Sequence, residues 1–353
     1  MKFTQTEKRQ LLIYGLTAFG VPYLMGLVMA VVHRAGGDTS IFANAQMYAP
    51  AAGVMLAMLF THREDSRMPR KFYISFLMLS ILLMGCCVMA ALMPQISWLV
   101  ISNLVILAGS LICWLFYFLD GKHRRTAYGL RLTGTGGKWV VGSVVLFLVL
   151  YFARIAIAGG LAWLSDPSLT LEDLGINSNL MVVGISLISL PLNFLLVYTA
   201  FFGEEYGWRG FLQPLMQRRF GARKGVVLLG VLWGLWHLPL NLFFYSPQTS
   251  LQSVVNQIVV CISLGVFFGW AYMKTKTIWV PVILHSLNNN LIAVLSSPDA
   301  ISNQVLTWGS VLFSAILISA LYLPFLSSRL YSDPQALPKP LPFPEPEQDA
   351  QES

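Results

Sequence analysis

The sequence predicts an all-α fold: a polytopic transmembrane helical bundle of about ten membrane-spanning helices, with both termini on the cytoplasmic side. Two properties of the composition lead to this prediction. Of the 353 residues, 56% are apolar and only 11% are charged, whereas soluble domains carry about 25% charged residues. The mean hydropathy is +0.65. So little polar surface excludes a cytosolic enzyme, a nucleic-acid-binding protein and a disordered protein.

The individual spans are predicted from runs of about 20 mostly apolar residues, the length that crosses the hydrocarbon core as a helix. The first run follows Lys2, Lys8 and Arg9 and has no small-residue cleavage site after it, so we interpret it as a retained span and not as a signal peptide. The ten predicted spans are residues 11–32, 41–61, 72–93, 98–119, 139–163, 180–203, 226–245, 255–273, 278–296 and 305–326.

The orientation is predicted from lysine and arginine, which are in excess in cytoplasmic loops. Of the 23 basic residues, 21 fall on one side of the ten predicted spans, and the exceptions are Arg34 and Arg154. This asymmetry predicts a multi-pass protein of the cell inner (cytoplasmic) membrane, with both ends inside. Basic residues beside spans are typical of contact with anionic lipid headgroups, and they do not form the single basic face that nucleic-acid binding requires.

Three regions are expected along the chain. Residues 1–138 form an N-terminal membrane region of about four helices, residues 139–326 form a membrane core, and residues 327–353 form a tail. From Asp333 onward the tail has six prolines in 21 residues, which predicts an extended, disordered cytoplasmic segment. All four cysteines lie inside apolar runs, so a disulfide framework or a zinc knuckle is not expected.

Ionisable residues at membrane depth are the informative ones, because each costs about 2.5–3.5 kcal/mol on insertion scales and marks a candidate functional site. Glu204 and Glu205 directly continue a predicted span. Glu205 and Arg209 are four residues apart, so they share a helical face and can pair. Glu204 is rotated by about 100° from its neighbour and is not satisfied by that pair. Taken alone, this stretch also fits a solvated helix end with one ion pair.

Two histidines lie inside predicted spans. His237 is about 16 Å into its helix, with Trp233 one turn earlier, and His285 is about 10 Å into its helix, with Asn289 one turn later. Each histidine alone is explained by a hydrogen bond between helices. Together with Glu204, they place an acid, two imidazoles and a carboxamide in the cytoplasmic half of three helices. This combination predicts a shared, water-filled functional site.

Three motifs therefore follow one another on separate spans: Glu204-Glu205-x-x-x-Arg209, Trp233-x-x-x-His237 and His285-x-x-x-Asn289. In this order they resemble the CPBP family of intramembrane proteases, also called the Abi or type II CAAX prenyl endopeptidase family, over roughly residues 180–296. The second motif of the family usually begins with phenylalanine, where this chain has Trp233. We expect this departure to alter a wall of the cavity more than its chemistry.

The resemblance implies an integral-membrane endopeptidase whose site opens toward the cytosol. Its substrate would be a peptide, a prenylated protein or a membrane-anchored protein at the bilayer. Glu204 and His237 would activate water, and His285 and Asn289 would stabilise the oxyanion. The expected supporting residues are Glu205, Arg209 and Trp233. Amide hydrolysis needs such a base, an activated water and donors where charge develops.

The cofactor and one alternative function stay open. The enzyme would either act as a glutamate protease without a cofactor or bind zinc through Glu204, His237 and His285 with a fourth position for water. The chain has no HExxH motif or other close pair of ligands, so the zinc mechanism is less favoured than the glutamate mechanism. The alternative is a non-enzymatic membrane transporter or a bacteriocin-immunity or scaffold protein, although a transporter needs polar groups reaching both leaflets. The sequence does not specify the substrate's identity or the oligomeric state.

Overall fold

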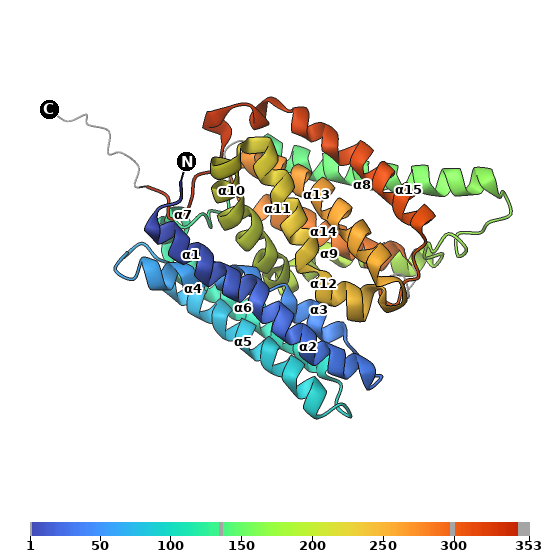
Figure 1. The fold of residues 1–353 in the computed structure, drawn as a ribbon, viewed down its shortest axis with the longest axis horizontal. Coiled ribbons are helices and arrows are strands. Elements are labelled where there is room, and N and C mark those ends of the chain that lie inside the picture. The colour runs from blue at the N-terminus through green and yellow to red at the C-terminus, as the bar shows by residue number, and fades with distance from the viewer. Residues whose placement is uncertain (1, 134–136, 297–300, 345–353) are drawn as a thin grey trace.

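A computed structural model describes residues 2–133, 137–296 and 301–344. Within these ranges the chain is helical, apart from loops and one isolated bridge between Ile176 and Ser296, so the predicted all-α class is confirmed (Figure 1). In the labels, η marks a 3-10 or π-helical turn. The elements are α1 (Gln5–Gly15), η1 (Leu16–Gly20), α2 (Val21–Arg34), α3 (Ser40–Gln46), α4 (Ala49–Thr61), α5 (Arg70–Leu92), α6 (Trp98–Leu119), α7 (Gly121–Ala127), α8 (Gly137–Ser165), α9 (Leu180–Glu205), η2 (Tyr206–Leu212), α10 (Gln213–Phe220), α11 (Ala222–Trp236), α12 (Leu238–Leu240), η3 (Asn241–Tyr245), η4 (Pro247–Thr249), α13 (Ser250–Thr275), α14 (Trp279–Leu295), α15 (Trp308–Tyr322), η6 (Leu323–Ser327), η7 (Arg329–Tyr331) and η8 (Pro334–Ala336).

The number of membrane spans is smaller than ten by the length criterion. In the described part of the chain, seven helices are long and apolar enough to cross a membrane, or eight if α11 and the segment Leu238–Tyr245, bent by 41°, count as one span. The predicted run 41–61 is divided into α3 and α4, because Pro50 lies in the first turn of α4 and has no N–H to donate to the preceding turn. The predicted run 278–296 forms α14, whose 17 residues extend about 26 Å, less than the roughly 30 Å of a hydrocarbon core.

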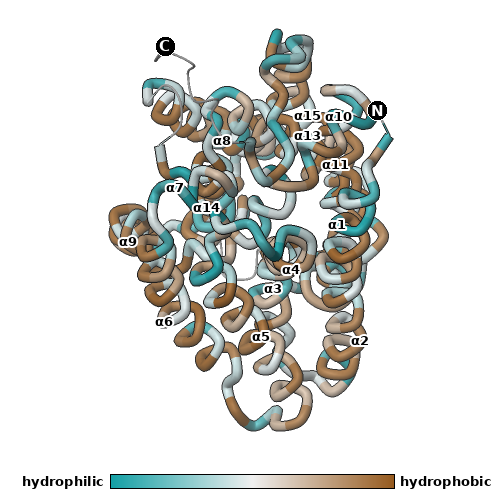
Figure 2. Tube along the Cα trace, turned by 90° about the vertical axis from the view of Figure 1, so that its left-hand side faces the viewer, coloured by the Kyte–Doolittle hydropathy of each residue, from teal (hydrophilic) through white to brown (hydrophobic). Residues whose placement is uncertain are grey.

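The outer surface of the bundle is apolar, as Figure 2 shows along α2, α5, α6 and α9. On α9, for example, the exposed fractions of Leu180, Met181 and Ile188 are 78%, 76% and 84%. Soluble monomers rarely expose apolar patches larger than a few hundred Å². A surface of this kind is stable in contact with lipid, and the chain is an integral, multi-pass membrane protein.

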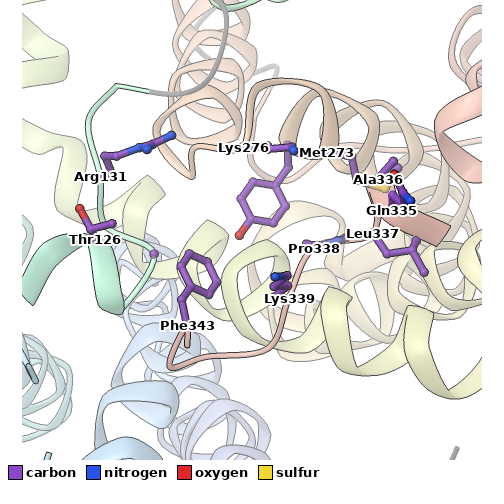
Figure 3. Close-up of a pocket in the computed structure, with 12 residues that line it drawn as sticks. Thr126, Arg131, Met273, Lys276, Gln335, Ala336, Leu337, Pro338, Lys339 and Phe343 are labelled. Atoms are coloured by element: carbon purple, nitrogen blue, oxygen red, sulfur yellow. The ribbon is translucent and has the colours of Figure 1, made fainter. Parts of the chain in front are cut away.

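The segment that follows α15 packs against the bundle. Tyr331 is 3% exposed and Leu341 is 6% exposed, and the Tyr331 hydroxyl donates to the Val266 carbonyl of α13 at 2.7 Å. Figure 3 shows Leu337, Pro338 and Lys339 on the opposite side of a pocket from Thr126 and Arg131. The predicted disordered tail is therefore wrong for residues 327–344, because prolines prevent a regular helix but not docking through a few apolar anchors. Residues 345–353 of that tail lie outside the described residues.

The end of this segment near Phe343 is held by α7 and by the loop between α4 and α5. The Phe343 amide donates to the Ala127 carbonyl at 2.7 Å, and Arg67 Nη1 donates to the Phe343 carbonyl at 3.2 Å. Arg67 also pairs with Asp65 at 2.9 Å. Partial burial raises the pKa of Asp65, but hydrogen bonds from Arg67 and Tyr128 outweigh this effect and lower the pKa overall. Asp65 is therefore ionised at neutral pH and keeps Arg67 in place.

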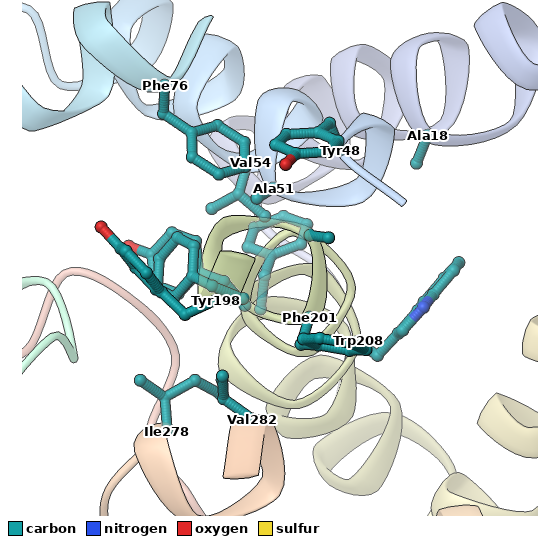
Figure 4. Close-up of a cluster of buried hydrophobic side chains, with 14 of the residues drawn as sticks. Ala18, Tyr48, Ala51, Val54, Phe76, Tyr198, Phe201, Trp208, Ile278 and Val282 are labelled. Atoms are coloured by element: carbon teal, nitrogen blue, oxygen red, sulfur yellow. The ribbon is translucent and has the colours of Figure 1, made fainter. Parts of the chain in front are cut away.

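Helix α9 packs against α4, α6 and α14, and its C-terminal residues Tyr198–Glu205 are buried. Figure 4 shows Tyr48 and Phe76 from the N-terminal region facing Tyr198 and Phe201 of α9. One continuous hydrophobic core contains residues from both sides of the boundary predicted at residue 138. The boundary itself stays a prediction, but the packing gives the N-terminal helices a role, since they form one wall around α9.

Two glycines allow this close approach. A Cβ atom at Gly203 would lie 3.0 Å from the Tyr48 Cα, and a Cβ atom at Gly207 would lie 2.8 Å from the Pro50 carbonyl carbon. Both contacts are to backbone, which cannot rotate away. The N-terminal region and the end of α9 are thus in direct backbone contact next to Glu204 and Glu205.

Replacing Gly207 with alanine is expected to destabilise the protein by about 1–3 kcal/mol, the usual cost of overpacking a core. The thermal unfolding midpoint in detergent measures this effect. Gly184→Ala, on the preceding helix α9, is the matched control, because a Cβ there meets nothing within 4 Å and alanine favours the helix. Equal midpoints for the two variants would contradict this account of the contact between α4 and η2.

Candidate active site

The first part of the site lies where α9 passes into the π-helical turn η2. Such π-helical turns are rare and occur often at functional sites. Glu204 and Glu205 occupy the last turn of α9, and Arg209 lies within η2. All three side chains are buried, with exposed fractions of 2%, 0% and 0%. The interpretation of this stretch as a solvated helix end is therefore wrong, because the surrounding helices bury it completely.

Glu204 is held by two tryptophans. Its Oε2 atom accepts a hydrogen bond from Trp233 Nε1 at 2.7 Å and another from Trp208 Nε1 at 3.3 Å. Hydrogen bonds to a charged acceptor contribute about 1.5–3 kcal/mol each. They fix Oε2, while none of the hydrogen bonds among the described residues uses Oε1, so that oxygen is available to a water molecule.

Trp233 changes the chemistry of the site as well as its wall. The expectation that tryptophan in place of phenylalanine alters mainly the wall is wrong, because the indole N–H donates to Glu204 and a phenyl ring has no donor. The same ring contacts both imidazoles, with centroids 6.1 Å from His237 and 5.6 Å from His285. The Arg209 guanidinium lies over its face at 4.3 Å. Trp233 is thus the common neighbour of the site's charged and polar groups.

Glu205 pairs with two partners. Its Oε1 atom accepts from Arg209 Nη1 at 3.2 Å, as the spacing predicts, and also from His285 Nδ1 at 2.8 Å. The second contact joins α9 to α14, and sequence spacing does not predict it. Because the carboxylate accepts at Nδ1, the His285 Nε2 atom is directed away from Glu205 and is available for a ligand. A carboxylate behind an imidazole is the arrangement that orients catalytic and metal-binding histidines.

His237 lies where α11 breaks. Pro239 lacks an N–H and its ring clashes with the preceding turn, so α11 ends at Trp236. The His237 amide bonds to the Gly234 carbonyl, which leaves the Trp233 carbonyl for the His237 side chain at 2.7 Å. A carbonyl only accepts, so Nδ1 carries the proton and Nε2 presents a lone pair.

Asn289 is the predicted residue that the structure does not join to this group. It lies on α14 one turn after His285, but it is exposed, and its oxygen accepts from Asn288 at 3.0 Å. No hydrogen bond among the described residues connects Asn289 to Glu204 or to either imidazole. The structure therefore gathers Glu204, Glu205, Arg209, Trp233, His237 and His285, and leaves Asn289 at the edge.

Sequence reasoning also missed two neighbours of the site. Trp208 lies four residues after Glu204 on the same face, a spacing that indicates the contact. Cys261 of α13 lies with its Sγ atom 3.9 Å from His237 Nδ1 and is buried. No spacing signal in the sequence indicates this second contact, because it depends on how α13 packs against α11.

The segment that carries these residues is similar to known proteins. Residues 178–291 match the family described as type II CAAX prenyl endopeptidase Rce1-like. This segment, called the Rce1-like domain below, is similar to the type II CAAX prenyl endopeptidase Rce1-like family. The predicted resemblance is confirmed, and the Rce1-like domain contains all seven predicted site residues.

One curated relative also matches. A protein named CAAX prenyl protease 2 from Methanococcus maripaludis is 33% identical over 126 residues, which is 33% of this chain and 46% of the relative. The chain thus spans less than half the length of that relative. No solved structure matches the chain.

A bound zinc ion would require Glu204, His237 and His285 to lie together as its ligands. Among the described residues of the whole chain, no three His, Cys, Asp or Glu side chains gather into a group that could hold a metal ion. Glu204 Oε2 is already occupied by two indole N–H groups. In this arrangement the predicted set does not fit a metal, and zinc stays a prediction to be tested by metal content.

Removing the indole donor is expected to lower the activity of the Rce1-like domain. Trp233→Phe deletes the 2.7 Å bond to Glu204, and the loss of about 1.5 kcal/mol of positioning corresponds to a rate about ten times lower. Trp208→Phe removes the longer 3.3 Å bond and should have a smaller effect. Rates of peptide cleavage for both variants check this order, and the reverse order would contradict it.

Proposed function

We propose that this chain is an intramembrane endopeptidase that hydrolyses peptide bonds of prenylated, peptide or membrane-anchored substrates near the cytoplasmic leaflet. The convergence of Glu204, His237 and His285 around Trp233, from three separate helices, is the observation that carries this conclusion. The family of the 178–291 segment supports the same activity. The excess of lysine and arginine on one side of the predicted spans supports a protein of the cell inner membrane whose site faces the cytosol.

Glu204 and His237 are proposed to activate a water molecule. The free oxygen of Glu204 and the Nε2 lone pair of His237 are both acceptors, and a water molecule has two hydrogens to offer them. Glu204 takes one proton as the water oxygen attacks the carbonyl carbon of the peptide. It then delivers that proton to the departing amine, as a general base that becomes a general acid.

His285 and Asn289 are proposed to stabilise the oxyanion that forms. With Nδ1 bonded to Glu205, His285 donates from Nε2 in its doubly protonated form, and the Glu205 carboxylate stabilises that charge. The Asn289 amide nitrogen is one helical turn away and supplies a second donor once it turns inward. Loss of one such donor typically costs about 100- to 1,000-fold in rate.

Cleavage by the purified protein tests this function. The full chain in lipid nanodiscs is supplied with an internally quenched peptide that ends in a prenylated cysteine motif, and with the same peptide without the prenyl group. His237→Ala is expected to lower the rate at least about 100-fold. His123→Ala, an exposed histidine on α7, is the matched control and should leave the rate unchanged.

The same preparation decides between the mechanisms. Metal content is measured before and after treatment with a chelator, together with activity. Activity that persists without metal assigns the glutamate mechanism, whereas activity lost and restored with zinc assigns the metal one. Solute or ion flux through the wild-type protein without any cleaved product would overturn the peptidase and favour the transporter alternative.

A further inference from the structure

A cavity of about 270 Å³ lies between the C-terminal segment, the end of α13 and the loop after α7. Three cationic side chains line it, Arg131, Lys276 and Lys339, each from a different segment, and Figure 3 shows them on three sides of the cavity. Of the described residues that line it, none is acidic. None of the hydrogen bonds or ion pairs among the described residues uses the side-chain nitrogens of these three residues.

A second cavity of about 120 Å³ adjoins the first and shares Thr126 and Arg131 with it. Its walls add Lys122 and Arg125, and again no acidic side chain is among the described lining residues. The acids of the neighbouring segments have other partners. Asp120 accepts from the Phe72 amide at 2.8 Å and lies 3.6 Å from Arg124.

Asp333 is the acid of the C-terminal segment within the described residues. It accepts from the Gln335 amide at 2.9 Å and is not among the residues that line either cavity. Five cationic side chains therefore line the two neighbouring cavities, and none of the described lining residues carries a carboxylate. Such a set repels itself, and a bound anion relieves the repulsion.

The backbone at Lys276 adopts a strained conformation beside the cavity. Lys276 ends α13 with φ 53° and ψ 31°, the left-handed region that glycine adopts without strain and other residues do not. The turn after it is tied to the opposite wall, because Thr277 donates to the Arg131 carbonyl at 2.8 Å and Trp279 Nε1 donates to the Leu130 carbonyl at 3.1 Å. A lysine in this conformation, at a residue that lines the cavity, is consistent with a role of its side chain there.

The rest of the wall is apolar. Tyr272, Met273, Leu337 and Phe343 line the larger cavity beside the cations. The cavity also lies at the end of α13, one of the helices long and apolar enough to cross the membrane. A ligand for this place combines a negative group with an apolar part and sits at the bilayer surface. Basic pockets between membrane helices bind lipid headgroups in this way.

We propose that this cavity binds the phosphate of an anionic phospholipid, with Arg131, Lys276 and Lys339 around the phosphate and the glycerol and upper acyl chain against the apolar wall. The shared chemistry is a phosphate, from a lipid headgroup or from free phosphate. The apolar half of the wall and the position at the end of α13 favour the lipid. The site is independent of the proposed peptidase residues.

Thermal unfolding of the full chain in detergent micelles tests this site, with three additions: phosphatidylglycerol, phosphatidylcholine and inorganic phosphate. We expect the midpoint of the wild type to rise with phosphatidylglycerol in a saturable way, and not with the other two. Arg131→Gln/Lys276→Gln is expected to weaken the apparent affinity for phosphatidylglycerol at least ten-fold. The matched control is Arg219→Gln/Lys224→Gln, two exposed cations that line neither cavity, and it should bind like the wild type.

Lys276→Gly separates binding from folding. Glycine relieves the left-handed strain, so the lipid-free variant should be at least as stable as the wild type and yet bind phosphatidylglycerol more weakly. Equal affinity for lipid in the wild type, the double variant and Lys276→Gly would overturn the site. Stabilisation by inorganic phosphate at the affinity seen with the lipid would overturn the lipid as the ligand and assign the cavity to a free anion.

Discussion

Replacing Glu204 with glutamine is expected to reduce peptide hydrolysis about 1,000-fold or more while the protein remains folded. Glutamine has the same shape, and its carbonyl oxygen still accepts the hydrogen bonds that Trp233 and Trp208 donate to Glu204. It has no basic oxygen, so it cannot take a proton from water. General acid–base catalysis contributes about 100- to 10,000-fold, and one residue serves in both proton transfers here.

The measurement is the cleavage rate at saturating substrate together with the thermal unfolding midpoint. We expect kcat to fall and KM to stay within about threefold, because Glu204 acts on the water and not on substrate binding. Glu7→Gln is the matched control, since Glu7 lies in α1 and pairs with Arg218, which is outside the three motifs. A Glu204→Gln variant that cleaves at more than a third of the wild-type rate would remove Glu204 from the mechanism.

The helices and the motif residues were predictable because the signals that indicate them are local. A run of apolar residues indicates a membrane helix whatever its neighbours are, and each of the ten predicted runs is largely helical in the structure. Spacing of four residues predicts the Glu205–Arg209 pair, which the structure confirms at 3.2 Å. Whether a helix spans the membrane depends on breaks such as the one before Pro50, which a count of apolar residues does not detect.

Contacts between helices were not predictable in the same way. The bond from His285 to Glu205 depends on how α14 crosses α9, and the donation from Trp233 to Glu204 depends on how α11 meets η2. Asn289 shows the converse, since it has the right spacing from His285 but no partner in the site. Docking of the C-terminal segment likewise depends on a few anchors, such as Tyr331, that composition does not distinguish from a disordered tail.

Replacing Arg209 with methionine is expected to destabilise the protein by about 3–5 kcal/mol, the cost of breaking a buried ion pair from one side. Arg209 is fully buried, pairs with Glu205 at 3.2 Å and lies over the Trp233 ring at 4.3 Å. Without it, the fully buried Glu205 keeps only His285 as a partner. Arg209→Lys should not restore the loss, because a lysine ammonium cannot reproduce the planar contact with the ring.

The four free cysteines offer the measurement, because all are buried and react with a thiol probe only as the protein unfolds on heating. The midpoint for Arg209→Met should fall by several degrees, whereas Glu205→Gln/Arg209→Met should recover most of the loss, since no charge is then left unpaired. Cleavage should stay low in the double variant, because a glutamine does not stabilise the charged form of His285. If Arg209→Met and the wild type unfold at the same temperature, the pair contributes nothing to stability. The expected double variant, stable but inactive, separates two roles of Glu205. One role is to pair with the buried Arg209, and the other is to orient His285 for catalysis.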